Sequence, residues 1–102
     1  MPESLHLSQF YELIHRSTRI NPSHISLYIA LCQKWSSGGF PTSFSISRSE
    51  MMAKSKIGSI TTYHKCIKEL ERLELIKYEP SYHPHLGSAV TLKPLGKLEV
   101  SS

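Results

Sequence analysis

The chain has 102 residues, which is the size of one domain with one modest core and argues against a two-domain enzyme. Its 12 Lys and Arg stand against 8 acidic residues, all of them Glu, and the net charge of +4 favours a polyanionic partner. Cys32 and Cys66 are too few and too far apart for a disulfide framework or a metal cluster, so we expect both to be reduced and buried.

The first ten residues, MPESLHLSQF, have neither a basic region leading into an apolar stretch nor a small-residue cleavage site, and so differ from a secretory signal. No apolar run approaches the roughly 20 residues needed to cross a bilayer. We therefore expect a cytoplasmic protein without membrane contact.

The first half of the chain predicts two helices and a short strand. Apolar residues recur at helical spacing in segment 4–17, and a second helix begins after NPSH and ends at SSGG. One side of this second helix carries Leu27, Tyr28, Leu31, Cys32 and Trp35. Segment 42–46, TSFSI, then alternates apolar and polar residues, which is typical of a strand with one buried face.

Two further helices follow, joined by a tight turn. Ser47 with Glu50 three residues later predicts a helix that runs to about Ser55, with the Ser side chain capping and the Glu reaching back to the cap residue. Gly58 and Ser59 should turn the chain into a helix capped by Ser59. On that helix the expected buried face is Ile60, Tyr63, Ile67, Leu70 and Leu73, with Cys66 at its edge. The opposite face carries Thr61, Lys65, Lys68 and Arg72.

Segments 75–78 and 89–93 predict the two strands of a β-hairpin, because a loop with two Pro and one Gly separates them. We therefore expect one domain, residues 1–93, that is mainly α with a small β-hairpin (α+β). Residues 94–102 form a tail with little structural signal.

This order of elements resembles the winged helix-turn-helix family of DNA-binding domains. The residues at the positions typical of that family are Met52, Ala53, Ser59, Thr62, Tyr63, Ile67, Leu70, Leu75 and Ile76. The segments HISLYIALCQKW and TTYHKCIKELERLELIKYEPSYHPHLGS are further similar to small winged-helix proteins encoded on mobile elements of gut anaerobes. The likeness covers residues 24–92.

Two positions depart from the family pattern. Ile57 stands where the family usually has Gly inside the turn, and Gly58 follows one place later, so the turn is expected to be reshaped or one residue longer. Glu74 stands where Gly often closes the recognition helix, so a left-handed cap is less favourable there.

The resemblance implies a sequence-specific protein that binds double-stranded DNA, acting as a transcriptional regulator or as an accessory factor for a mobile element. The helix from Ser59 would lie in the major groove, which an α-helix fits, with the 77–93 hairpin as wing. The free amides at the start of this helix also favour a phosphate. The residues expected to contact DNA are Arg48, Lys56, Ser59, Thr61, Thr62, His64, Lys65, Lys68, His83 and His85. For Lys68 and Arg72, ion pairs with Glu71 or Glu69 are an equal alternative.

His83 and His85 have a spacing that suits either a metal ion or a minor-groove contact from the wing tip. A third metal ligand would have to come from His64, Cys66 or His6, and Cys66 is expected on the buried side. We therefore assign no metal and no cofactor. His15 and His24 are expected at the helix surface or as capping groups.

Catalysis is not expected. The chain has no Asp, no Gly-rich phosphate loop and no nucleophile elbow, and the spacing of Glu69, Glu71 and Glu74 suits solvent exposure. The stronger alternative is a protein–protein interaction module, because the fold does not fix the function. The cationic stripe is also compatible with an ordinary solvated surface.

A single small domain presents one recognition helix, so we expect a homodimer on a site with two-fold character. The seam would comprise Leu5, Leu7 and Tyr11 of the first helix, with Leu95, Leu98 and Val100 of the tail adding to it. Packing of the tail on the first helix of the same chain is the alternative. No small-molecule ligand is expected.

Overall fold

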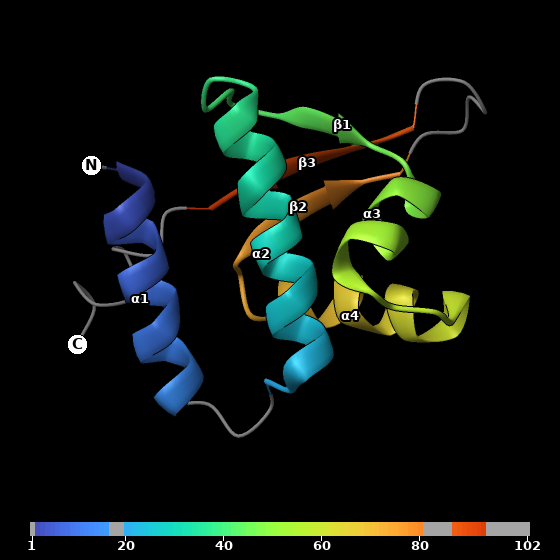
Figure 1. Cartoon of the computed structure of the whole chain (residues 1–102), viewed down its shortest axis with the longest axis horizontal. Coiled ribbons are helices and arrows are strands. Elements are labelled where there is room, and N and C mark those ends of the chain that lie inside the picture. The colour runs from blue at the N-terminus through green and yellow to red at the C-terminus, as the bar shows by residue number, and fades with distance from the viewer. Residues whose placement is uncertain (1, 17–19, 81–86, 94–102) are drawn as a thin grey trace.

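The computed structural model describes residues 2–16, 20–80 and 87–93 (Figure 1). These residues are mainly helical with a small antiparallel sheet, which confirms the expected α+β class. The elements in chain order are α1 (Pro2–Arg16), α2 (Pro22–Ser37), β1 (Phe44–Ile46), α3 (Arg48–Ser55), α4 (Ile60–Arg72), β2 (Ile76–Glu79) and β3 (Ser88–Leu92).

The sheet has three strands in the order β1-β3-β2, and both strand pairs are antiparallel. Val90 in the central strand stands opposite Phe44 on one side and opposite Tyr78 on the other. The predicted hairpin is therefore present, but it is not alone, because the short strand β1 pairs with it.

Each helix from α2 onward begins at a side-chain cap. The side chain of Asn21 accepts a hydrogen bond from the backbone N–H of His24 (3.1 Å), and Nδ1 of His24 accepts one from the N–H of Asn21 (3.2 Å). This reciprocal box satisfies two backbone donors and starts α2 at Pro22, earlier than predicted, and it confirms a capping role for His24.

Ser47 and Ser59 cap the next two helices as predicted. Their hydroxyls accept hydrogen bonds from the N–H groups of Glu50 (3.1 Å) and Thr62 (3.2 Å). The carboxylate of Glu50 differs from the prediction, because it turns to Lys34 and Lys54 instead of back to Ser47.

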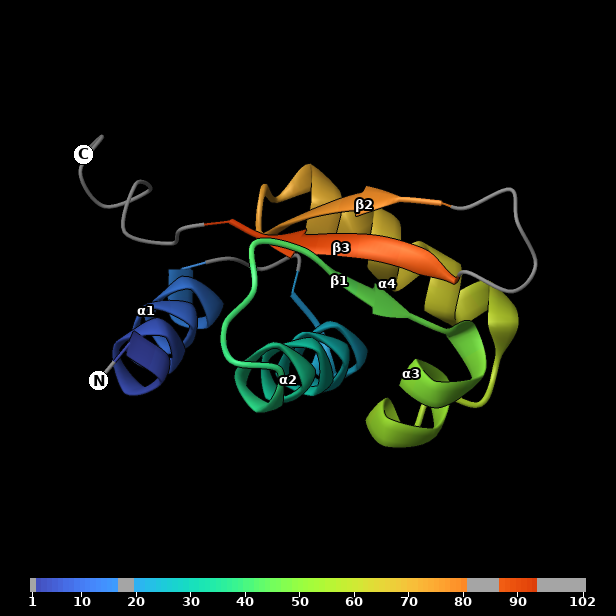
Figure 2. The same cartoon turned by 90° about the horizontal axis from the view of Figure 1, so that it is seen from above.

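The core lies between the helices and one face of the sheet. Both views place α2 between α1 and α3, while α4 packs against α2 and β2 (Figures 1 and 2). Phe10 of α1 packs its ring on Tyr28 of α2, with the ring centroids 4.1 Å apart. Trp35 is half-buried, so it lies at the border of the core and not inside it. Side chains with almost no exposed surface are Leu27, Tyr28, Leu31, Met51, Tyr63, Leu70, Leu75, Ile76 and Val90.

The turn between α3 and α4 differs from the expected geometry. The left-handed residue is Lys56 (φ 62°), whereas Gly58 lies outside the left-handed region. The N–H of Ile57 bonds to the carbonyl of Met52 (3.1 Å), and the Ile57 side chain is buried. This pattern is a Schellman-type helix end with its apolar contact, which explains why an apolar residue follows Lys56.

The same arrangement closes α4. Glu74 adopts φ 62°, and the N–H of Leu75 bonds to the carbonyl of Leu70 (3.0 Å). The left-handed cap that the sequence made unfavourable at Glu74 is therefore present. Burial of Leu75 offsets the strain of a non-glycine residue in this conformation.

Candidate nucleic-acid interface

Helix α4 separates an apolar side from a polar one. Tyr63, Cys66, Ile67 and Leu70 are buried, so Cys66 belongs to the core and not to its edge. The assignment of Ile60 to this face is wrong, because 49% of Ile60 is exposed. Leu73 is only half-buried. Burial raises the pKa of the Cys66 thiol, which keeps that thiol neutral.

The opposite side of α4 presents hydrogen-bonding and cationic groups. Its exposed residues include Thr61, His64, Lys65, Lys68 and Arg72. Thr62 is half-buried, and the Ser59 hydroxyl already accepts a bond from its N–H (3.2 Å), so these two are less available than the sequence suggested.

Ion pairs separate the cations of α4 into two kinds. Arg72 pairs with Glu69 at 3.6 Å, one of the alternatives that the sequence left open. Lys65 and Lys68 pair with none of the carboxylates in the described part of the chain. Their charges are thus available to a partner.

Arg48 and Lys56 flank the start of α4 through α3 and the connecting turn. Arg48 is exposed at the first position of α3, where the positive end of the helix dipole does not favour a cation. Its charge acts on Tyr63 of α4, whose pKa is raised to about 12 by burial and by neighbouring Tyr78, while Arg48 opposes that shift. Arg48, a cation that its own helix does not favour, therefore lies near α4, and Lys56 precedes α4 in the connecting turn.

Hydrogen bonds link the hairpin to α4 and link its two strands near the connecting loop. The Glu71 carboxylate accepts a hydrogen bond from the N–H of Tyr78 (3.4 Å), which links α4 to β2. The Tyr78 hydroxyl lies 2.9 Å from Oγ of Ser88, across the two strands. In both views the end of the hairpin where β2 ends and β3 begins lies at the same end of the molecule as the start of α4 (Figures 1 and 2).

Two predicted histidines, His83 and His85, lie outside the described residues, as do Leu95, Leu98 and Val100 of the tail. Within the described ranges, no three His, Cys, Asp or Glu side chains are placed to hold a metal ion. His64 is exposed and its ring packs edge-on to Tyr63, with centroids 5.5 Å apart.

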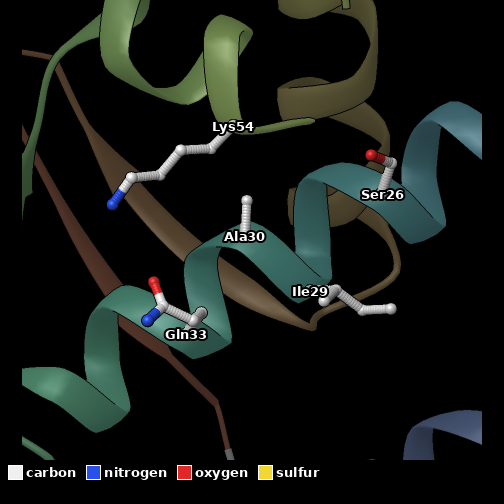
Figure 3. A pocket seen from close by; sticks show the side chains of 5 residues that line it. All are labelled: Ser26, Ile29, Ala30, Gln33 and Lys54. Atoms are coloured by element: carbon white, nitrogen blue, oxygen red, sulfur yellow. The ribbon is translucent and has the colours of Figure 1, made fainter. Parts of the chain in front are cut away.

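A second surface feature lies on α2 and α3. A cavity of about 430 Å³ is lined by Ser26, Ile29, Ala30, Gln33 and Lys54 (Figure 3). Four of these residues come from α2, and 48% of Ile29 is exposed. The sequence did not single out this surface, because Ile29 stands alone between the residues of the buried stripe.

Across residues 2–16, 20–80 and 87–93, no helix combines the length and apolarity of a membrane span. Comparisons with protein-family models, curated proteins and solved structures found no match. The geometry and charge of the chain itself are therefore the basis for inferring its function.

Proposed function

We propose that this chain is a winged helix-turn-helix protein that binds double-stranded DNA. In this proposal α3 and α4 are the helix-turn-helix, the α4 surface lies in the major groove, and the β2–β3 hairpin is the wing. The element order supports it, as does the position of the hairpin, whose end at Glu79 and Ser88 lies at the same end of the molecule as the start of α4.

The observation that carries the proposal is that two lysines of α4, Lys65 and Lys68, form no ion pair with a carboxylate in the described part of the chain. Lys65 and Lys68 are exposed on the side opposite Tyr63 and Leu70, with Thr61 one turn before Lys65. A surface that only needed solubility would gain from pairing these lysines with nearby glutamates, as Arg72 does with Glu69. Phosphates and base edges are acceptors that fit hydroxyl and ammonium groups in this order.

A homodimer is the assembly that suits such a short reading surface, because two copies double the contacts and fix two half-sites about one turn of DNA apart. Tyr11 of α1, one residue of the expected seam, is 61% exposed, and the side chains of Leu5 and Leu7 lie outside the described part of the structure. Regulation of transcription, or service to a mobile element, follows from the resemblance and from specific DNA binding.

The experiment that tests DNA binding starts from a random-sequence duplex library. We expect the purified protein to enrich a defined sequence, and its affinity for that duplex to fall steeply between about 50 and 200 mM salt, because bound phosphates release counterions. Absence of enrichment together with salt-independent binding would leave the α2–α3 cavity, with its exposed Ile29, as the better indication of function. That outcome would favour a protein–protein interaction module.

A further inference from the structure

Ile60 is a half-exposed apolar side chain outside the core of the described protein. It is the first residue of α4 and is 49% exposed. It belongs neither to the buried core nor to the partly buried apolar side chains packed against that core. Apolar spacing along α4 would assign it to the core, so its exposure needs another explanation.

The surroundings of Ile60 are polar and cationic. It follows Ser59 and precedes exposed Thr61, with Lys56 in the preceding turn and Lys65 in the next turn of the helix. No other large apolar side chain of α4 is exposed among the described residues. A protein partner usually needs a wider apolar patch than one side chain, whereas a polyanion with small apolar features fits a lone isoleucine among cations.

The direction of Ile60 is set by its place on the helix. Residues spaced by three or four share one side of a helix, so Ile60, His64, Ile67 and Glu71 follow one flank of α4, which is buried at Ile67 and exposed at Ile60, His64 and Glu71. The carboxylate of Glu71 accepts the hydrogen bond from Tyr78 of β2, so this flank adjoins the hairpin. Ile60 therefore lies at the border between the buried and the exposed side of α4, in the first turn, which is the part of a recognition helix that contacts base edges.

We propose that Ile60 contacts the C5-methyl group of a thymine in the major groove and so makes the first turn of α4 selective for thymine. The proposal rests on the DNA-binding function proposed above. In the major groove thymine presents an acceptor oxygen and a methyl group, and apolar side chains recognise the methyl. Thr61 beside it supplies a hydroxyl suited to the acceptor.

The test removes the methyl without changing base pairing. In the duplex selected from the random library, each thymine is replaced singly by deoxyuridine, and affinity is measured for wild type, Ile60→Ala and Ile29→Ala. Ile29 is the matched control, because it is a helical isoleucine of nearly equal exposure, 48%, on α2. Thermal melts verify that both variants fold.

We expect wild type to lose about fourfold in affinity at one thymine of each half-site, the value for burying one methyl group. Ile29→Ala should keep this loss, whereas Ile60→Ala should bind the thymine and uracil duplexes equally at that position. The proposal is overturned if no thymine is methyl-sensitive in wild type, or if Ile60→Ala retains the same sensitivity. Either result leaves salt-dependent DNA binding intact, so failure here is distinct from failure of the DNA-binding function.

Discussion

Lys34 of α2 and Glu50 of α3 form an ion pair, with Nζ and Oε1 2.5 Å apart, that joins the two helices. Lys54 reaches the other carboxylate oxygen at 3.4 Å. The hydrogen bond from Lys34 lowers the pKa of the Glu50 carboxyl below its ordinary value of 4.5, more than burial raises it. The position of α3, which leads into α4, therefore depends in part on this carboxylate being charged.

Glu50→Gln should lower the free energy of unfolding at pH 7 by about 0.5–1 kcal/mol, because the pair is partly exposed to solvent. Since the folded pKa is depressed, the stabilisation is present above the ordinary carboxyl value and is lost as pH falls below it. Urea unfolding should thus give a difference between wild type and variant at neutral pH that disappears as pH falls through the lowered pKa of Glu50. Glu79→Gln is the control, because its pair with Lys77 is longer, 4.0 Å, and both side chains are mostly exposed. An equal effect of the two changes would contradict a specific role for Glu50.

Leu70→Ala should destabilise the protein by roughly 2–5 kcal/mol, because Leu70 is fully buried on the core side of α4 and its truncation leaves a cavity. Lys68→Ala on the exposed side of the same helix should change stability by less than about 0.5 kcal/mol. Chemical denaturation measures both. A cost below about 1 kcal/mol at Leu70 would mean that the core contacts of α4 are assigned wrongly.

Glu74→Gly should stabilise the protein by about 0.5–1 kcal/mol, because glycine relieves the strain of the left-handed conformation at φ 62°. Lys68→Gly, in the exposed interior of α4, should instead cost about 1 kcal/mol. Melting curves of the two variants should therefore shift in opposite directions. Destabilisation by Glu74→Gly would show that the Glu side chain contributes more than its backbone strain costs.

Lys65→Ala should weaken DNA binding and leave the melting temperature unchanged, because Lys65 is exposed and pairs with no described carboxylate. Loss of one phosphate contact should reduce the slope of log affinity against log salt by about one unit. Arg16→Ala, in the last turn of α1, removes an equal charge from a helix outside the proposed helix-turn-helix and should leave the slope unchanged. Identical slopes for all three proteins would place Lys65 in solvent.

Local signals in the sequence predicted the helices, the two serine caps and the hairpin strands, because caps and apolar spacing act over a few residues. Pairing of β1 with β3 escaped prediction, since register between strands distant in sequence depends on the whole fold. Ile60 was misassigned for a related reason. The spacing of apolar residues predicts which side of α4 faces the core. It does not show that the first residue of the helix, Ile60, stays half-exposed.

The left-handed conformations of Lys56 and Glu74 were also missed, because the turn was expected around Ile57 and Gly58 and a left-handed cap at Glu74 was expected to be less favourable. The buried Ile57 and Leu75 that follow them were the available signal, because an apolar residue after the cap is part of this helix end. In the candidate site, the sequence predicted the cationic side of α4, but it left open which cations pair within the helix, and the structure pairs Arg72 with Glu69.

The central claim is that the exposed side of α4 binds the duplex, and NMR titration of the isotope-labelled protein with the selected DNA tests it most directly. We predict that the largest amide shifts fall on Lys56, Thr61, His64, Lys65 and Lys68. Smaller shifts are expected where β2 ends and β3 begins. Residues of the α2–α3 cavity, including Ile29 and Gln33, should change little. Shifts concentrated at that cavity, with α4 unperturbed, would contradict the account.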